Sequence, residues 1–365
     1  MVWSADFALI GHPQNWGAAE GVLSSLRRPQ PPILSDDLRD IFPWLPPRTV
    51  CRVSVGVPGE SEARGVYIDS FIPPDRLEAR FLRENLVRVR DAAAYAIREG
   101  ARIVTLGGFS SILLEGKLDL LPQHPATAFT TGNTLTVALI VRGMERAAEL
   151  AGRCLEHASL LIIGASGDVG SGCARCFASR VKKLLLCARN SDRLHKFATQ
   201  LTGVGAEIEV GTDLQQLAAK ADLIICAASM AASTLFLEEN SRCTIVCDAG
   251  YPKNMESDCA PADGAIFFGG LGQVTGGIRF DPDLREILNP HPFPNVAYGC
   301  LLEGVVLAMA RRFEPFSRGR GLITPDRVDE IWKIAQKHGV TLAPLFNAEG
   351  PVEERISQLS PEVRT

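Results

Sequence analysis

A regular alternation of apolar strands and helices begins after Gly152, and it constrains the fold more than any other feature of this 365-residue chain. Short apolar runs recur at intervals that leave room for a helix between them. Strands are expected at 159–163, 183–187, 207–210, 223–227, 244–248 and 265–268, with a helix over 169–181 after the first. Such alternation implies right-handed βαβ crossovers and a parallel sheet. The sequence therefore predicts an α/β fold with a doubly wound parallel sheet.

A glycine-rich turn of the form G-x-x-G-x-x-G stands between the first of these strands and its helix. It consists of Gly164, Ala165, Ser166, Gly167, Asp168, Val169 and Gly170. In this context the backbone N–H groups and the helix N-terminus would meet a pyrophosphate. A tight strand-to-helix turn without a ligand is the alternative. The flanking elements favour a dinucleotide-binding loop of the Rossmann type.

The end of the second strand favours NADPH as the cofactor. An acidic residue would hold the ribose 2′-OH of NAD there, but Cys187 is followed by Ala188, Arg189 and Asn190. Arg189 is suited to a 2′-phosphate, with a solvated surface arginine as the alternative. Ala228 and Ser229 close a later strand and would lie beside the ribose and nicotinamide.

The part before Gly152 is less regular. Prolines forbid long helices across the first 65 residues, where we expect loops around short strands. Apolar spacing predicts a helix over 74–99, then a short strand at 103–106 that runs into the glycine-rich turn 107–111. A second such segment, 129–134, precedes a helix over 135–152. Both segments follow strands, so we expect them to face one cleft.

Three segments follow from this pattern. Residues 1–157 are expected to form an N-terminal α/β substrate domain, and residues 158–290 the NADPH-binding Rossmann domain. Residues 291–365 are expected to form a C-terminal helical segment that packs back on the N-terminal domain, with a polar, frayed tail from Glu349 onward.

Composition excludes several classes of function. The net charge of −4 (38 Lys and Arg against 42 Asp and Glu), without a basic block, argues against nucleic acid or anionic membranes as partners. No apolar run is long enough to span a bilayer, and the N-terminus lacks a basic signal region, so we expect a cytoplasmic protein. The ten cysteines are interpreted mostly as buried, reduced thiols. Cys173 and Cys176 lack a second pair at metal-ligand spacing, so we expect no metal site.

Cys300 differs from the other cysteines because it follows a proline-rich breaker. A helix is expected over 296–312 with Asn295 as its N-cap, which places Cys300 in the first turns, where the helix dipole stabilises a thiolate. From spacing alone a core cysteine is the more common outcome.

Several segments together resemble one family, the cyanobacterial-type long-chain acyl-[acyl-carrier-protein] reductases. They are 7–12 (FALIGH), 106–111 (LGGFSS), 129–134 (FTTGNT), 164–170, 187–190 (CARN), 228–230 (ASM) and 248–254 (DAGYPKN). The likeness runs in order from about residue 7 to 340, although 36–65, 271–281 and the tail after 340 depart from it. The resemblance implies reduction of fatty acyl thioesters on a carrier protein, or on coenzyme A, to fatty aldehydes by NADPH.

The resemblance also implies roles for individual residues. Cys300 falls where the family's nucleophilic cysteine is expected, with Glu303 three residues later, so an acyl-cysteine intermediate is expected. Oxyanion and substrate contacts are expected from Gly108, Phe109, Ser110, Ser111, Thr131, Asn133 and Lys253; these groups could instead cap helices and satisfy turns. An apolar channel is expected between the first domain and the last helices.

The expected partners are an acyl-carrier protein or acyl-CoA, and an enzyme that consumes the aldehyde. A basic patch of Arg311, Arg312, Arg318 and Arg320 is a candidate dock for an acidic carrier, with a solvated helix end as the alternative. Two other functions stay open. One is a shikimate-dehydrogenase-like alcohol or ketone oxidoreductase without covalent catalysis, and the other is a non-catalytic NADPH-binding regulator.

Overall fold

The structure is a computed structural model that describes residues 5–26, 35–57, 62–201, 203–228, 245–250, 253, 264–319 and 321–359. The chain divides into two compact units that interleave along the sequence. Unit 1 comprises Met1–Asn133, Gly272–Gly319 and Lys333–Thr341, and unit 2 comprises Thr134–Leu271, Arg320–Trp332 and Leu342–Thr365. This division differs from the three consecutive segments that the sequence suggested, because residues 134–157 group with the Rossmann part and residues 272–319 with the N-terminal part.

Unit 1 is built on a sheet with the strand order β13-β2-β3-β1-β4-β5. The strands are β1 (Phe7–Gly11), β2 (Arg48–Val55), β3 (Ala63–Asp69), β4 (Ile103–Leu106), β5 (Ala128–Thr130) and β13 (Ile278–Asp281). Strands β3, β1, β4 and β5 are parallel, whereas β2 and β13 run antiparallel to their neighbours. The carboxyl ends of β1, β4 and β5 therefore meet at one edge of the sheet, followed by His12, Gly107 and Thr131.

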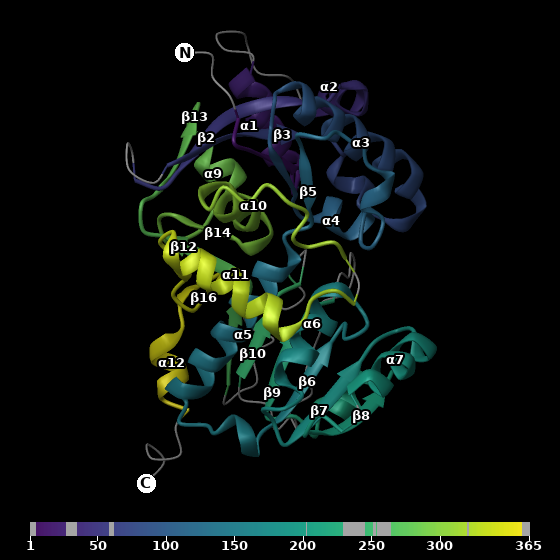
Figure 1. The fold of residues 1–365 in the computed structure, drawn as a ribbon, viewed down its shortest axis with the longest axis vertical. Helices are drawn as coiled ribbons and strands as arrows, with labels where there is room; N and C mark the ends of the chain where they lie inside the picture. The colour runs from purple at the N-terminus through teal and green to yellow at the C-terminus, as the bar shows by residue number, and fades with distance from the viewer. Residues whose placement is uncertain are drawn as a thin grey trace. The chain divides into compact units, whose positions relative to one another are not determined.

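Helices cover both faces of this sheet (Figure 1). Helices α3 (Leu82–Arg98) and α4 (Phe109–Leu113) pack on one face, where Ala8, Ile10 and Val104 are among the buried side chains. Helix α10 (Gly299–Met309) packs on the other face, against β1, β3 and β4. Its close approach requires Gly304, since a Cβ there would lie 1.8 Å from the Thr105 Oγ1 atom.

The first 65 residues hold more regular structure than their prolines suggested. Helices α1 (Trp16–Leu26) and α2 (Ser35–Ile41) and the 3-10 turn η1 (Phe42–Trp44) lie between β1 and β2. Pro43 is accepted in the first turn of η1, while Pro46 and Pro47 come just before β2. The prolines thus bound the elements instead of excluding them.

The remaining elements of unit 1 are short. They are 3-10 turns η2 (Pro74–Arg76), η3 (Ala79–Phe81) and η4 (Leu118–Leu120), helix α9 (Arg285–Leu288), and a small sheet of order β14-β12-β15 from Val296–Tyr298, Leu271–Val274 and Val340–Leu342. The predicted helix over 74–99 is therefore wrong in its first two turns, which are 3-10 segments.

Unit 2 is built on a sheet of six parallel strands with the order β11-β10-β9-β6-β7-β8. Its strands are β6 (Ser159–Ile163), β7 (Lys183–Cys187), β8 (Glu207–Gly211), β9 (Leu223–Cys226), β10 (Ile245–Asp248) and β11 (Ala265–Phe268). The chain starts in the middle, at β6, and proceeds to each side in turn (Figure 1). This order is that of a doubly wound Rossmann sheet, so the predicted fold class is confirmed.

Unit 2 also contains helices, of which α6, α7 and α8 connect strands of this sheet. They are α5 (Asn133–Leu150), α6 (Asp168–Phe177), α7 (Ser191–Ala198) and α8 (Leu214–Ala218), with 3-10 turns η5 (Leu155–His157) and η6 (Thr199–Leu201); α11 (Pro325–Lys337) follows later and is shared between the two units. Strands β7 and β9 contribute Leu185 and Ile224 to a core that α8 covers with Leu217. Continuous apolar strands of this kind are typical of parallel sheets that are buried on both faces.

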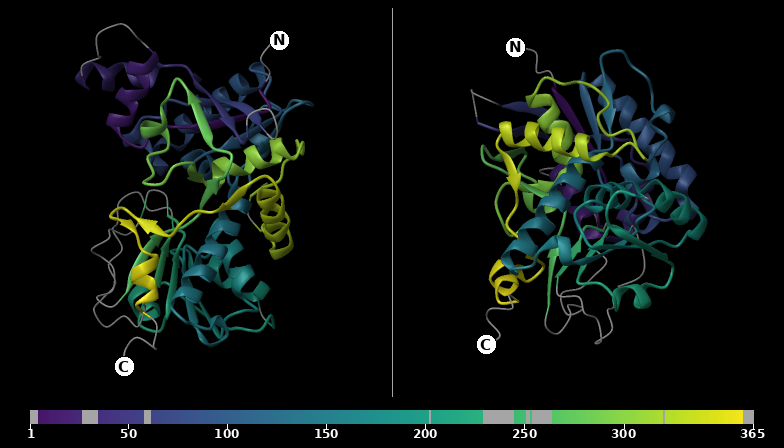
Figure 2. Two further views of the ribbon diagram at one scale, coloured as in Figure 1. Left: turned by 90° about the vertical axis from the view of Figure 1, so that its left-hand side faces the viewer. Right: turned by 60° about the horizontal axis from the view of Figure 1, so that its bottom comes forward.

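Residues 346–357 form regular elements, so the prediction of a frayed tail from Glu349 is wrong as far as Leu359, the last residue described in this segment. Strands β16 (Phe346–Asn347) and β17 (Gly350–Pro351) form a hairpin, and helix α12 (Glu353–Ser357) follows. The hairpin lies against β11 (Figure 2). The Phe346 and Phe268 rings meet edge-on, with their centroids 6.0 Å apart. Val352 and Ile356 are buried, and this spacing of one helical turn anchors the segment.

Candidate active site

Cys300 is the second residue of α10, and the element before it is a strand. Val296–Tyr298 form β14, so the helix begins three residues later than predicted. Asn295 is not its N-cap: that residue has φ +60°, and its side-chain oxygen accepts from the Ile278 N–H at 3.1 Å. Tyr298 occupies the N-cap position, and its side chain does not cap the helix. Cys300 therefore lies in the first helical turn, where unpaired backbone N–H groups favour an anion.

Two glycine-containing loops enclose Cys300, one after β4 and one after β5. A Cβ at Gly132 would lie 2.1 Å from the Cys300 carbonyl oxygen, and Gly132 has φ +73°, which other residues rarely adopt. A Cβ at Gly107 would lie 2.8 Å from Leu301 Cδ2. The structure thus brings the predicted loops 107–111 and 129–134 together around the predicted cysteine.

Opposing influences set the acidity of Cys300. The residue keeps part of its surface exposed, yet burial raises the pKa of its thiol above the ordinary value. The backbone N–H groups of Gly108, Leu301 and Cys300 favour the thiolate and lower the pKa, whereas the nearby Glu303 carboxylate raises it. The backbone donors therefore stabilise the Cys300 thiolate, whereas burial disfavours its formation.

Glu303 is fully buried one turn after Cys300 and joins three segments of unit 1. Its Oε2 atom accepts from Ser317 Oγ at 2.8 Å, and its Oε1 atom accepts from Thr130 Oγ1. The Ser317 N–H donates to Thr130 Oγ1 at 3.0 Å, and the Thr131 N–H donates to the Ser317 carbonyl at 3.1 Å. This network ties β5 to α10 directly beneath the loop that contacts Cys300.

The predicted oxyanion and substrate residues separate into two groups. The hydroxyl groups of Ser110 and Thr131 are buried and have no hydrogen-bond partner among the described residues. The Ser111 hydroxyl donates to the Gly108 carbonyl at 2.8 Å, as the turn-forming alternative predicted. Ser110 and Thr131 therefore keep donors available for a ligand.

The other predicted substrate residues are Phe109, Asn133 and Lys253. Phe109 is the first residue of α4, and Asn133 is buried at the start of α5. Lys253 belongs to unit 2, where its Nζ donates to the Asp248 carbonyl at 2.9 Å and lies 4.9 Å from the centre of the Phe268 ring. Its role in substrate binding stays a prediction.

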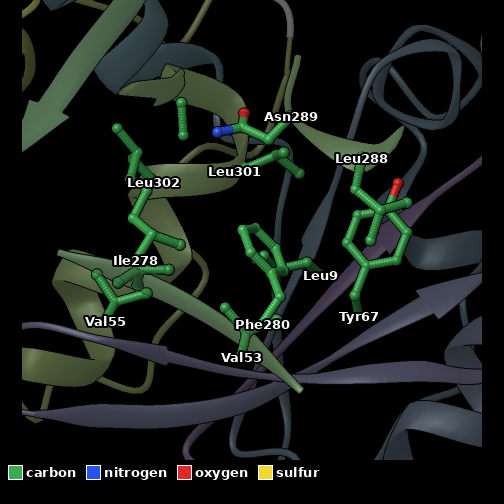
Figure 3. A pocket seen from close by; sticks show the side chains of 12 residues that line it. Leu9, Val53, Val55, Tyr67, Ile278, Phe280, Leu288, Asn289, Leu301 and Leu302 are labelled. Atoms are coloured by element: carbon green, nitrogen blue, oxygen red, sulfur yellow. The ribbon is translucent and has the colours of Figure 1, made fainter. Parts of the chain in front are cut away.

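An apolar pocket in unit 1 begins one residue after Cys300. It encloses about 370 Å³ of space not filled by atoms, including its open mouth. Its lining consists of Leu9, Val53, Val55, Tyr67, Ile278, Phe280, Leu288, Asn289, Ala297, Leu301, Leu302 and Val305. Figure 3 shows Leu301 and Leu302 of α10 on one side and Val53 and Val55 of β2 on the other. The sequence did not show this lining, because β2 and β13 lie far apart in the chain.

The glycine loop of unit 2 joins β6 to α6 as predicted. A Cβ at Gly170 would lie 2.3 Å from the Gly164 carbonyl oxygen, so the helix can start close to the strand only with glycine there. The N–H groups of Gly164 and Ala165 donate to the Cys187 carbonyl, and the Gly167 N–H donates to the Gly164 carbonyl. Gly167 is the N-cap of α6, and Asp168 lies in the first turn.

The residues after β7 hold one feature that sequence reasoning missed. Arg189 is exposed, while the Asn190 side chain caps α7 by accepting from the Arg193 N–H at 2.9 Å. The Arg193 guanidinium donates to the Ser166 carbonyl in the glycine loop. The sequence did offer a signal for this contact, because Arg193 follows Arg189 by four residues and falls in the first turn of α7. Ala228 packs near Gly164, and Ser229 lies outside the described residues.

Two further cysteines, Cys173 and Cys176, are buried in α6, and burial raises the pKa of the Cys176 thiol to about 12. Across the described ranges, His, Cys, Asp and Glu side chains nowhere gather into a group that could hold a metal ion. In the same residues, no helix has the length and apolarity needed to cross a membrane.

Comparison with known proteins agrees with this arrangement. Residues 145–268 match the family model "Shikimate / quinate 5-dehydrogenase", a range that contains all six strands of the unit 2 sheet and does not reach Cys300. Among solved structures, quinate dehydrogenase from Corynebacterium glutamicum in complex with NAD is 14% identical, with a TM-score of 0.34, over 92% of this chain and 99% of that one. The strand order of unit 2 and the family match identify a Rossmann-type domain that is similar to the corresponding part of shikimate and quinate 5-dehydrogenases.

A relative that matches nearly the whole chain narrows this class. The long-chain acyl-[acyl-carrier-protein] reductase of Synechococcus elongatus is 30% identical over 348 residues, which cover 91% of this chain and 97% of that protein. This chain therefore belongs to the long-chain acyl-[acyl-carrier-protein] reductase family. Aminotransferase PigE from Serratia is 26% identical over 270 residues, 71% of this chain, but this chain spans only 30% of that protein.

Proposed function

We propose that this protein reduces a long-chain fatty acyl thioester to a fatty aldehyde with NADPH, through an acyl-cysteine on Cys300. One observation carries the proposal. A cysteine in the first turn of α10 has the Gly108, Leu301 and Cys300 N–H groups around its sulfur, and an apolar pocket opens at the next two residues. A nucleophile with anion-stabilising donors beside an apolar pocket suits an acyl thioester.

In the first step the Cys300 sulfur attacks the thioester carbonyl. A new carbon–sulfur bond forms to Cys300, the bond to the donor thiol breaks, and the donor leaves carrying the proton that Cys300 lost. Because one thioester replaces another, the exchange is nearly isoenergetic. The N–H groups around Cys300 contribute by increasing the thiolate fraction of a thiol whose burial opposes ionisation.

In the second step the acyl-cysteine is reduced. NADPH, when bound at the glycine loop, supplies the hydride that adds to the acyl carbon. The resulting hemithioacetal loses the Cys300 sulfur, and aldehyde and thiol are released. Both steps place negative charge on the acyl oxygen, for which we propose the Ser110 and Thr131 hydroxyl groups as donors. The acyl chain would enter the apolar pocket next to Leu301 and Leu302.

The residues of unit 2 fit NADPH. The N–H groups of Gly164 and Ala165 donate to the Cys187 carbonyl at the end of β7, and the Gly167 N–H donates to the Gly164 carbonyl, so these three donors are already in use. We therefore propose that the pyrophosphate binds the N–H groups of Ser166 and Val169 at the start of α6. Arg189 is exposed and would hold the 2′-phosphate, with Arg193 fixing the loop beneath it.

We propose an acyl-carrier protein as the acyl donor, with acyl-CoA as a substitute, and an aldehyde-consuming enzyme downstream. The predicted basic patch is partly neutralised within unit 1. Arg311 pairs with Asp6 at 3.3 Å, Arg312 pairs with Glu314, and the Arg318 Nε donates to the Pro315 carbonyl at 3.1 Å. Arg320 lies outside the described residues. The patch therefore contributes less free positive charge than its sequence suggested.

The test is the intact mass of the protein after incubation with a palmitoyl-carrier protein, first without NADPH and then with it. We expect an acyl adduct that maps to Cys300, disappears on adding NADPH and releases aldehyde. Cys300→Ala should prevent the adduct, whereas Cys154→Ala should keep it and so control for acylation of an exposed thiol. No adduct on Cys300, with NADPH binding intact, would refute the proposal and favour a non-covalent oxidoreductase.

A further inference from the structure

His12 follows β1 at the sheet edge where the two glycine-containing loops meet, and the proposed mechanism does not use it. Its side chain is buried, with 5% of the residue exposed. The Phe109 N–H donates to His12 Nε2 at 3.1 Å, and His12 Nδ1 lies 3.1 Å from the Pro13 carbonyl oxygen. Because Nε2 accepts a hydrogen bond, it carries no proton, so Nδ1 donates to Pro13. Burial lowers the pKa of His12 to about 4, and the ring is therefore neutral at physiological pH.

The hydrogen bond to Phe109 controls the peptide next to Cys300. Phe109 is the first residue of α4, whose N–H groups have no partner within the helix. The preceding Gly108 has φ +54° and ψ −127°, a backbone conformation that residues with a Cβ avoid. This turn is tied to the end of β1 at two points, by Gly107 N–H to the Ile10 carbonyl at 2.7 Å and by Phe109 N–H to His12. Between these points lies the Gly108 N–H, whose hydrogen bond lowers the pKa of the Cys300 thiol.

We infer that His12 is a positioning residue: its Nε2 atom holds the Phe109 peptide so that the Gly108 N–H stabilises the Cys300 thiolate. The inference rests on the proposed function in assigning Cys300 as the nucleophile. His12 acts as a hydrogen-bond acceptor and takes no proton from Cys300. Its edge-on contact with the Phe109 ring, with centroids 6.4 Å apart and planes at 89°, fixes the ring orientation.

A histidine beside a reactive cysteine more often serves as a general base, and that is the competing explanation. A base must exchange its proton during each turnover. In this structure both ring nitrogens engage backbone groups of two adjacent loops, and charging the ring would break the bond to Phe109. Two substitutions separate the explanations, since glutamine can place an oxygen near the position of Nε2, while asparagine can place its amide near Nδ1.

The experiment measures the rate at which iodoacetamide alkylates Cys300 as a function of pH in wild type, His12→Gln, His12→Asn and His12→Ala, with peptide mapping to isolate this thiol. We expect His12→Gln to keep the wild-type profile. His12→Asn and His12→Ala should shift it to higher pH and slow alkylation roughly tenfold at neutral pH, because a hydrogen bond to an ionised sulfur is lost. Two ionisable residues near this site, Glu303 beside Cys300 and Asp69 opposite Gly11, are present in every variant and so do not cause differences between the profiles.

Three outcomes would overturn the inference. They are a His12→Gln profile that matches His12→Ala, a His12→Asn profile that matches wild type, and a profile that no substitution moves. The first of these, with acyl transfer lost as well, would indicate a general base. Because alkylation needs no acyl donor, the test is independent of the proposed reaction, whose own failure would appear as a missing acyl adduct in wild type. Equal NADPH affinity in all variants checks that the Rossmann unit is intact.

Discussion

Replacement of Glu303 tests whether its buried carboxylate organises the site around Cys300. In Glu303→Ala, the hydroxyl groups of Thr130 and Ser317 lose their acceptor in fully buried surroundings. Each orphaned donor costs about 1–3 kcal/mol, and removing one member of a buried charged network costs about 3–5 kcal/mol. We therefore expect a loss of about 3–5 kcal/mol in the free energy of unfolding, measured by urea denaturation.

Glu303→Gln separates the charge from the geometry. Its side-chain oxygen can still accept from Thr130, and its amide can donate to Ser317 Oγ, so the loss should stay near about 1–2 kcal/mol. The Glu303 charge raises the pKa of the Cys300 thiol, so removing it should lower that pKa. The alkylation profile of Cys300 in Glu303→Gln should therefore move to lower pH.

The matched control is Glu314→Gln, which removes a carboxylate from an exposed pair with Arg312 in the same unit. Exposed pairs contribute about 0–1 kcal/mol, so neither the stability nor the Cys300 profile should change measurably. A Glu303→Gln protein as unstable as Glu303→Ala, or a Cys300 profile that moves to higher pH, would refute this role of the Glu303 network.

Two further predictions concern glycine and arginine positions. Gly132→Ala should lose about 2–5 kcal/mol of stability and its acyl adduct, because the new Cβ would clash with the Cys300 backbone at a residue with φ +73°. The control, Gly100→Ala, has φ +77° but open space around it, and should lose only about 1–2 kcal/mol. Equal losses in the two variants would contradict the steric argument. Arg189→Ala should weaken NADPH binding roughly tenfold or more in a fluorescence titration and leave NADH binding unchanged. Arg193→Ala should weaken the binding of both cofactors, because it removes the hydrogen bond to the Ser166 carbonyl in the glycine loop. If Arg193→Ala weakened the binding of NADPH alone, the two arginines would have the opposite roles.

The Rossmann unit was predictable because its signals are local. Strands β6, β7 and β11 have the expected bounds. A strand that is buried on both faces consists of one continuous run of apolar residues, so its ends are visible in the sequence. The same locality explains the glycine loop, whose residues are contiguous. The boundaries of Val296–Tyr298 were wrong because this segment is as apolar as the helix it precedes, and its pairing with β12 is a long-range contact.

The site of unit 1 was predictable only in part. Cys300 and its two loops could be named from the resemblance, but Glu303's partner Ser317 and the pocket residues of β2 and β13 could not. These contacts join strands and helices that are far apart in the chain, and periodicity carries no information about them. His12 shows the same limit, since only the parallel pairing of β1 with β4 places it beside Phe109.

The buried cysteines provide a last prediction, because their burial has a measurable pH signature. Burial raises the pKa of Cys226 from its ordinary value of 9.0 to about 12, with the Asp248 charge as a smaller cause. Above pH 9 the unfolded chain loses this proton while the folded chain keeps it, so the thiol stabilises the fold less as pH rises. The expected slope is about −1.4 kcal/mol per pH unit between about pH 10 and 12.

Cys226→Ala isolates this contribution. The substitution removes a fully buried thiol, so it lowers stability at every pH by a constant amount for the lost packing. Its pH dependence above pH 9 should be shallower than that of wild type by the slope of one thiol, while Cys154→Ala, at an exposed position, should follow the wild-type curve. Urea denaturation from about pH 8 to pH 11 measures both. Parallel curves for wild type and Cys226→Ala would mean that Cys226 ionises as readily in the folded chain as in the unfolded one, and that strand β9 is not sealed from water.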